Sequence, residues 1–155
     1  MRFGLLEIII LNCTMGDVML SVIPINVERK KIICKYILNN HKQKLLLSEL
    51  ADELSISNRN CSRIIRDQFG TTFPRLLNAV RLYHTLEYYQ GNNEGITESA
   101  IKGGFPDKQT FVRWWHHWVG LPLHGKNINM KRIHNKLSEE YRKIIENVLL
   151  CLKET

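Results

Sequence analysis

A pattern of small, hydrophobic and basic residues occurs twice in this chain of 155 residues. The first copy consists of Ala51, Ser55-Ile56, Cys61, Arg63, Ile65 and Gly70. The second copy consists of Ala100, Gly104-Phe105, Phe111, Arg113, Trp115 and Gly120. From Cys61 and Phe111 to the two glycines the spacing is the same. Each copy predicts a short helix, a tight turn and a second helix with a polar face. This is the layout of a helix-turn-helix, whose second helix lies in the major groove of DNA.

The charge of the chain agrees with a nucleic-acid partner. Lys and Arg number 22 against 15 Asp and Glu, a formal net charge of +7, and the sequence pI is about 9.4. A pI above about 9 is typical of nucleic-acid-binding domains, although many basic domains bind none. The positive excess lies on residues 28–125 and 126–155, whereas residues 1–27 carry a small negative excess.

Cysteine usage and hydropathy exclude several other classes of protein. Cys13, Cys34, Cys61 and Cys151 lack the spacing of a metal finger, so we expect buried, reduced thiols in a reducing cytoplasm. No run of about 18 apolar residues is present to span a membrane. The motifs of phosphate-binding loops, serine nucleophiles and paired carboxylates are missing, and adjacent histidines such as His116 and His117 cannot chelate one metal ion from a helix. We therefore expect no enzyme activity, no cofactor and no metal.

Hydrophobic spacing divides the chain into helices and connections. The predicted helices cover residues 28–39, 47–54, 58–69, 73–90, 97–102, 108–118 and 138–152. Ser57, Thr72 and Ser138 are the expected N-caps, and Gly70 is the expected C-cap. Residues 126–135 read as a polar linker. The last helix has one apolar face, which either packs against the domain or forms a dimer contact.

Residues 1–27 are harder to interpret. Two apolar runs, residues 3–11 and 18–25, favour either two strands or a helix and a strand. A secretory signal fits poorly, because Glu7 interrupts the first run and Arg2 is the only cation before it. The segment is too short for an intact ligand-binding domain, so we expect an effector-less regulator or a fragment with a residual upstream element.

The two predicted second helices separate polar from apolar residues in the same way. At 100° per residue, the polar sides consist of Arg59, Ser62, Arg63 and Arg66, and of Gln109, Val112, Arg113 and His116. The opposite sides consist of Cys61, Ile64, Ile65 and Gln68, and of Phe111, Trp114, Trp115 and Trp118. Any surface helix has a polar side, but these contain Arg and Gln in place of Lys and Glu mixtures. Arg can bind guanine and Gln can bind adenine with two hydrogen bonds, so both sides are predicted to read bases.

The predicted helix over residues 73–90 provides a spacer between the two units. It would be roughly 27 Å long, while successive major grooves on one side of B-DNA lie about 34 Å apart. A rigid helix of this length could place the two reading helices one turn of DNA apart.

Residues 29–124 resemble the DNA-binding domain of the AraC/XylS family of bacterial transcription regulators. In the first unit the matching residues are Leu47-Ser48-Glu49-Leu50-Ala51, Ser57, Arg63, Gly70-Thr71-Thr72-Phe73 and Arg81-Leu82. In the second unit they are Ile96-Thr97-Glu98, Ala100, Gly104-Phe105, Phe111-Val112-Arg113 and Gly120. The resemblance implies an all-α fold with two helix-turn-helix units, residues 47–69 and 96–119, joined by a linker helix over residues 73–90. This domain at residues 28–125 would follow an N-terminal extension, residues 1–27, and precede a basic linker with a C-terminal amphipathic helix, residues 126–155.

The resemblance also implies a function, a set of contacts and a set of partners. The base-reading candidates, combining the family's contacts with the two polar sides, are Arg59, Ser62, Arg63, Arg66, Lys108, Gln109, Val112, Arg113 and His116. The phosphate-contact candidates are Thr71, Thr72, Lys102 and Lys126. We expect sequence-specific binding of double-stranded DNA on the bacterial nucleoid, and activation of transcription through contact with RNA polymerase. Residues 1–27 or 138–152 are the candidates for a homodimer contact.

Some residues depart from the family pattern. Ser99 stands where the family has an aliphatic core residue, and we expect its hydroxyl to bond a backbone carbonyl. Leu123 replaces a proline, with Pro122 beside it, and residues 114–118 are unusually aromatic. Ser99 and residues 114–118 favour an alternative, a degenerate AraC-like interaction module that binds a regulator or RNA polymerase without reading DNA. The Arg-rich side of residues 59–66 opposes it. Arg81 is expected to be structural, paired with an acidic side chain.

Overall fold

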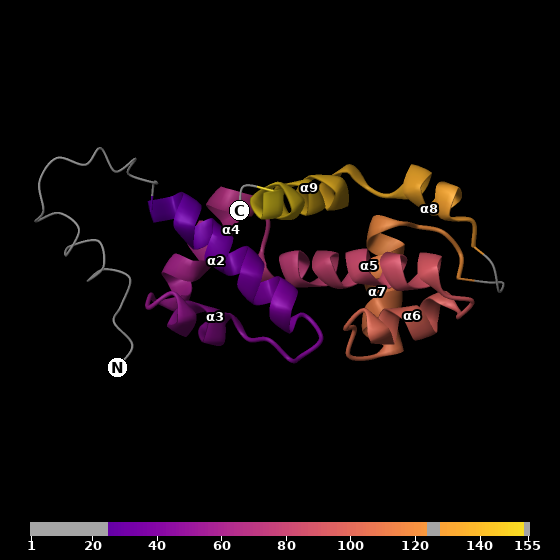
Figure 1. Ribbon diagram of the computed structural model, residues 1–155, viewed down its shortest axis with the longest axis horizontal. Coiled ribbons are helices and arrows are strands. Elements are labelled where there is room, and N and C mark those ends of the chain that lie inside the picture. Colours follow the sequence, from indigo (N-terminus) through magenta and orange to yellow (C-terminus); the bar gives the residue numbers. More distant parts are fainter. Residues whose placement is uncertain (1–24, 124–127, 154–155) are drawn as a thin grey trace, which may run out of the picture.

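The computed structural model describes residues 25–123 and 128–153. This part of the chain is all-helical, with eight helices and no strand (Figure 1). The helices are α2 (Ile25–Asn40), α3 (Leu47–Glu53), α4 (Asn58–Phe69), α5 (Phe73–Gly91), α6 (Ile96–Lys102), α7 (Lys108–Trp118), α8 (Met130–Lys136) and α9 (Glu139–Lys153). The predicted all-α fold is confirmed: α3 and α4 form one helix-turn-helix unit, α6 and α7 form the second, and α5 runs between them.

Local hydrogen bonds explain where the helices of the first unit begin and end. The Glu49 carboxylate accepts a bond from the Leu46 backbone N–H at 3.0 Å, which satisfies one free donor at the start of α3. The Ser57 hydroxyl accepts from the Asn60 N–H at 3.2 Å and begins α4. Gly70 ends α4 with a φ of 65°, a conformation that glycine adopts without strain. Both predicted caps of α4 are confirmed.

The long helix α5 spans 19 residues, so it is roughly 28 Å long. Thr72 precedes it in the extended conformation of an N-cap, but its side chain makes no capping hydrogen bond. Arg81 is buried in α5 and is structural, as predicted, but the expected acidic partner was wrong. Its guanidinium donates to the backbone carbonyls of His41 at 2.9 Å and Gln43 at 3.0 Å. Backbone carbonyls of the loop between α2 and α3 thus accept the hydrogen bonds that a carboxylate was expected to accept.

The second unit is built around aromatic side chains. Phe111, Trp115 and Trp118 are almost fully buried, and the Trp115 indole N–H donates to the Leu121 carbonyl at 2.6 Å. Phe111 and Trp115, which the sequence placed opposite the polar side of this helix, therefore lie in the core. Ser99 is fully buried, but its hydroxyl makes no hydrogen bond to any described atom. The expected bond to a backbone carbonyl was wrong.

Residues that follow the second unit fold back along α5. The stretch interpreted as a linker contains α8, which begins at the Asn129 cap and buries Ile133 completely. Ser138 caps α9 as predicted, because its hydroxyl accepts from the Tyr141 N–H at 3.3 Å. The Glu140 carboxylate in the first turn of α9 accepts from the Trp118 indole N–H at 3.1 Å. The tail is thus attached to the end of α7.

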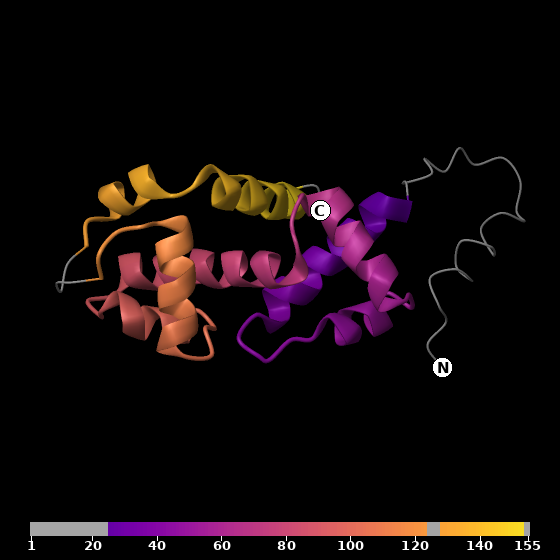
Figure 2. The same cartoon turned by 180° about the vertical axis from the view of Figure 1, so that it is seen from behind.

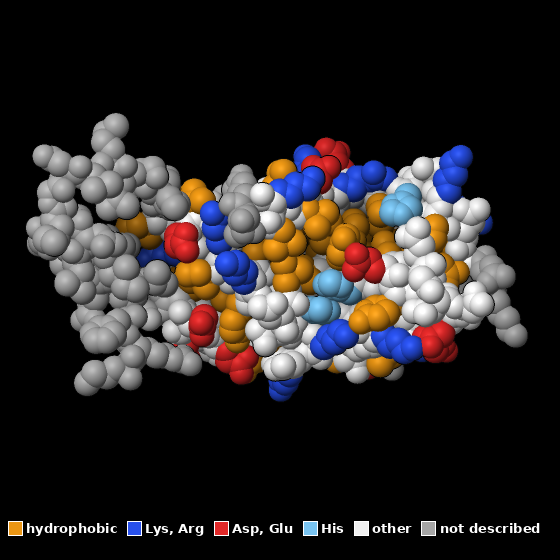
Figure 3. Space-filling model, viewed as in Figure 1, with side chains coloured by type: hydrophobic (Ala, Val, Ile, Leu, Met, Phe, Trp, Pro, Cys, Tyr) orange, Lys and Arg blue, Asp and Glu red, His pale blue; other side chains and the backbone are white. Residues whose placement is uncertain are grey.

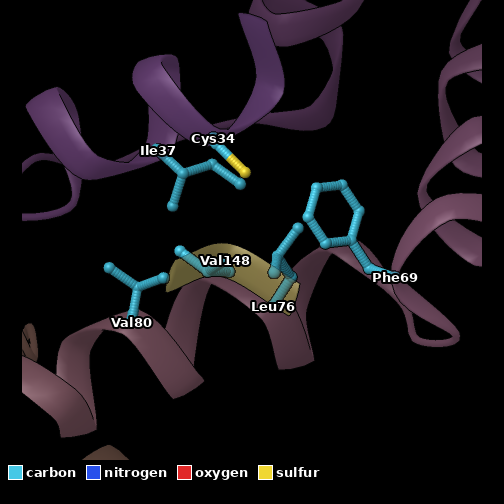
Figure 4. A pocket seen from close by; sticks show the side chains of 6 residues that line it. All are labelled: Cys34, Ile37, Phe69, Leu76, Val80 and Val148. Carbon is cyan, nitrogen blue, oxygen red and sulfur yellow. The ribbon is translucent and has the colours of Figure 1, made fainter. Parts of the chain in front are cut away.

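The apolar face of α9 packs inside the domain. Figure 4 shows Val148 of α9 facing Cys34 and Ile37 of α2, with Leu76 and Val80 of α5 beside them. Most of this face is buried within one copy of the chain, with Tyr141, Ile144, Ile145, Val148 and Cys151 in the core. Of the two readings of this helix, internal packing is the one observed, so residues 138–152 do not offer this apolar face to a second copy.

The remaining expectations concern the thiols and the N-terminus. Cys34, Cys61 and Cys151 are buried and free, as predicted. Cys13, and with it residues 1–24 of the expected extension, lies outside the described residues. The first described helix begins at Ile25, three positions before the predicted boundary. Among the helices described here, none has the length and apolar character that crossing a bilayer requires.

Candidate nucleic-acid interface

Helices α4 and α7 lie on the same side of the molecule. Figure 2 shows both in front, with α4 crossing over α2 and α7 crossing over α5, whereas in Figure 1 both lie behind these helices. The two units lie at different positions along the long axis of the molecule, and α4 and α7 are both exposed on one face. This is the arrangement that two consecutive major grooves require.

The same turn geometry positions both helices. The Ile56 N–H donates to the Ala51 carbonyl at 3.0 Å, and the Phe105 N–H donates to the Ala100 carbonyl at 3.1 Å. In each unit a residue with positive φ precedes the donor: Ser55 at 53° and Gly104 at 107°. Ala51 and Ala100 are buried, and the helices that contain them, α3 and α6, pack against α4 and α7. The repeat in the sequence is therefore a repeat of one turn.

The α4 face carries three cations toward solvent. Arg59, Arg63 and Arg66 are exposed, and Ser62 between them is half-buried. Cys61, Ile64 and Ile65 on the opposite side are in the core. The residues predicted to read bases therefore occupy one exposed face, which we call the α4 face.

The α7 face has the same layout but less charge. Gln109, Arg113 and His116 are exposed and Val112 is half-buried, while Lys108 lies exposed at the start of the helix. The Asp107 carboxylate caps α7 by accepting from the Thr110 N–H at 2.7 Å. This hydrogen bond, with one from the Thr110 hydroxyl, lowers the pKa of Asp107 below its ordinary value. Asp107 therefore places a permanent negative charge at the edge of the α7 face.

The phosphate-contact candidates are less uniform. Lys102 is exposed and pairs with Glu94 at 2.6 Å, while Thr72 is half-buried. Thr71 is only 7% exposed and its hydroxyl is enclosed without a hydrogen-bond partner among the described atoms. The phosphate contact of Thr71 stays a prediction, and it would need a small movement that exposes this hydroxyl. Lys126 lies outside the described residues.

Sequence reasoning missed the residues that border the α4 face. Asn58 and Asn60 are exposed in the first turn of α4, and Asp67 is exposed near its end. The N-terminal turn of a recognition helix commonly contacts base edges, and an Asn side chain can bind adenine. The signal that could have found the two asparagines was their position directly after the Ser57 cap.

Comparisons with known proteins identify the family to which this region is similar. The family described as "Helix-turn-helix domain" matches residues 50–124, which include α4, α5, α6 and α7. The HTH-type transcriptional activator RhaS of Klebsiella pneumoniae (strain 342) is 29% identical over 86 residues. Residues 50–124 belong to the AraC/XylS-type helix-turn-helix family. This family consists of transcription regulators and is not a class of enzymes.

The AraC/XylS-type domain is a small part of its relatives. The match to RhaS covers 56% of this chain and 31% of RhaS. Uncharacterized HTH-type transcriptional regulators of Staphylococcus aureus strains MSSA476 and COL are each 28% identical over 95 residues, which cover 61% of this chain and 13% of those proteins. The chain therefore spans much less than two thirds of the length of these relatives. No solved structure matches it significantly.

Proposed function

We propose that this chain binds DNA sequence-specifically by inserting α4 and α7 into adjacent major grooves of one duplex, and that it activates transcription. The observation that supports the proposal is the common side of the two helices, each with an exposed arginine at the matching position, Arg63 and Arg113 (Figure 2). Each arginine can hold the O6 and N7 atoms of a guanine.

The base-reading set divides between the two helices. On α4 it consists of Arg59, Ser62, Arg63 and Arg66, and on α7 of Lys108, Gln109, Val112, Arg113 and His116. Thr72 and Lys102 border these helices and would contact phosphates, as would Lys126. Such contacts set the register of the protein on the duplex, whereas the base contacts select its sequence.

Selection of DNA from a random pool by the purified chain tests this proposal. We expect selected sites to contain two short motifs about 10 base pairs apart, one for each helix. Arg63→Ala should relax selection in one motif, lower affinity by about 1–3 kcal/mol and reduce the salt slope by about one. Arg132→Ala removes an equally exposed arginine of α8 and is the matched control, expected to leave the motifs unchanged.

Other outcomes of the selection would contradict particular parts of the proposal. A single motif would mean that only one helix reads DNA. Enrichment of no sequence, with a salt slope that Arg63→Ala does not change, would favour the interaction module over a DNA reader. Transcription in a purified system with bacterial RNA polymerase tests the activator role, because a repressor would lower the transcript yield from a promoter that carries the selected site.

A further inference from the structure

The two helix-turn-helix units touch each other directly through the loop that joins α2 to α3. A Cβ atom built on Gly104, in the turn of the second unit, would lie 2.7 Å from the His41 carbonyl oxygen and 3.1 Å from the Lys42 Cα. The first distance is shorter than a Cβ can tolerate and the second is tight, so the backbone of the second unit contacts the loop that leads into the first unit. Gly104 is required here both for this approach and for its φ of 107°.

The long helix α5 holds the same loop from its other side. Arg81 of α5 donates to the carbonyls of His41 and Gln43, at 2.9 and 3.0 Å. The His41 ring stacks on the His84 ring of α5, with centroids 4.1 Å apart and planes inclined by 12°. We call these five residues, His41, Gln43, Arg81, His84 and Gly104, the joint.

The hydrogen bonds of the two stacked rings fix where a proton would be added. Nδ1 of His41 lies 2.7 Å from the Leu38 carbonyl and Nδ1 of His84 lies 3.1 Å from a Glu87 carboxylate oxygen. Because both partners are acceptors, each Nδ1 carries a hydrogen. A second proton must therefore go to Nε2, and both Nε2 atoms are buried with no hydrogen-bond partner among the described atoms. An unpaired N–H⁺ in such a place is costly.

Some groups around the two histidines lower their pKa values and others raise them. Burial lowers the pKa of His41, and the neighbouring His84, Lys42 and Arg81 lower it further, although the bond to the Leu38 carbonyl raises it. Burial also lowers the pKa of His84, with Lys42, while Glu87 opposes this shift. The Tyr83 ring packs edge-on against His84 and adds no charge near neutral pH, because burial and Glu87 raise its pKa.

We propose that the joint fixes α4 relative to α7, and that it is closed when the His41 and His84 rings are both neutral and opens when they are protonated. This inference rests on the proposed function in one respect: the joint would control whether the protein reads two DNA motifs at one fixed spacing. His84 keeps 23% exposure of its side chain. Figure 3 shows the face that is turned away from α4 and α7, with histidine side chains near its centre. The exposed part of the His84 side chain lets protons reach the joint.

The sign of the pH effect follows from the direction of both shifts. Each histidine has an ordinary pKa of 6.5 and a lower one in the closed joint. Below pH 6.5 the open form therefore binds more protons than the closed form. The joint is fully stable above this pH and loses stability as the pH falls below it.

A distance measurement that needs no DNA tests the joint. Spin labels carried by noncanonical residues at Asp67 of α4 and Lys108 of α7 report the separation of the two helices. We expect a narrow distance distribution at about pH 7.5 and a broad one at about pH 5.5. His84→Lys should be broad at both pH values, and His41→Phe combined with His84→Phe should be narrow at both. His134→Phe, which removes an exposed histidine of α8, should behave like the unaltered chain.

The same variants then connect the joint to DNA reading. Between about pH 7.5 and pH 5.5, affinity for DNA with two motifs should fall about tenfold more than affinity for DNA with one motif. The one-motif DNA corrects for any effect of pH on the binding of a single helix. Circular dichroism at each pH tests whether the helices persist. If the double variant does not fold, the distance distribution of His84→Lys at about pH 7.5 still tests the proposal.

An unchanged distance distribution in His84→Lys, or in the unaltered chain at the lower pH, would overturn the proposed opening of the joint. Absence of DNA binding at the higher pH would instead overturn the proposed function.

Discussion

The two helix-turn-helix units share one backbone plan and differ in what they place on its surface. Both bury an alanine under the turn, and both display one face of the second helix on the same side of the molecule. The α4 face carries three exposed arginines, whereas the α7 face carries two exposed cations, Lys108 and Arg113, with Gln109 and His116. In the proposed complex the first unit would contribute more to electrostatic attachment, and the second more through hydrogen bonds that select bases.

The two units also differ in the side chains that fill their cores. Position 65 in α4 is an isoleucine, whereas the matching position 115 in α7 is a tryptophan, and both side chains are fully buried. Trp115 also donates to the Leu121 carbonyl. The second unit thus buries its apolar area in a few large aromatic rings, whereas the first buries it in several aliphatic side chains. We therefore expect the loss of one core residue to destabilise the second unit more.

The largest effect that tests this comparison is Trp115→Ala. Truncating a fully buried aromatic residue costs about 3–5 kcal/mol, and Ile65→Ala about 2–5 kcal/mol. We expect Trp115→Ala to unfold the second unit while α2, α3 and α4 remain folded, and Ile65→Ala to act on the first unit. Hydrogen exchange resolved along the chain measures this difference. Equal loss of protection in both units from either change would show that they unfold together and not as separate bodies.

Exchanging the residues at the two turns gives the next effect in size. Gly104→Ser introduces a Cβ that meets the His41 carbonyl and forces a side chain into φ 107°, so we expect a loss of about 1–3 kcal/mol. Ser55→Gly in the first unit relieves a φ of 53°, and it should raise stability by up to about 1 kcal/mol. Urea unfolding monitored by circular dichroism gives both values. A stabilising Gly104→Ser would mean that the two units are not in backbone contact.

The faces themselves are compared by removing one arginine from each. Arg63→Ala and Arg113→Ala should each lower affinity for the selected DNA by about 1–3 kcal/mol. The remaining salt dependence separates them: removing all three α4 arginines should reduce the salt slope by about three, and Arg113→Ala by about one. Titrations at several salt concentrations measure the slopes. Equal slopes after the triple and single changes would contradict the assignment of electrostatic attachment to the first unit.

Local signals in the sequence predicted much of this fold. The repeated spacing identified both units, and Ser57, Gly70 and Ser138 marked helix ends, because caps depend on neighbouring backbone groups. Helix α8 was missed because its seven residues are polar apart from Met130 and Ile133, and packing of those two side chains is a tertiary effect. The exposure of the arginines followed from helical periodicity. The burial of Thr71 did not, because it depends on how α4 and α5 meet.

The hydrogen-bond partners of Arg81 could not be predicted from the periodicity of the sequence. Arg81 was expected to pair with a carboxylate, but it donates to two carbonyls about forty positions earlier in the chain and to the Asn78 Oδ1 atom of its own helix. No local pattern indicates which backbone oxygens a loop leaves free. The stacking of His41 on His84 is hidden for the same reason, because each histidine on its own resembles an ordinary surface residue.

The smallest expected effects come from the caps that begin the two reading helices. Ser57→Ala removes the hydrogen bond to the Asn60 N–H and should lower stability by about 1 kcal/mol. Asp107→Asn keeps a capping oxygen for the Thr110 N–H but removes a negative charge beside the phosphates. We expect it to leave the fold intact and to strengthen DNA binding most at low salt, where screening is weakest. Weaker binding of Asp107→Asn would contradict this expectation, and it would indicate that the charge of the carboxylate strengthens a hydrogen bond from a cytosine amino group.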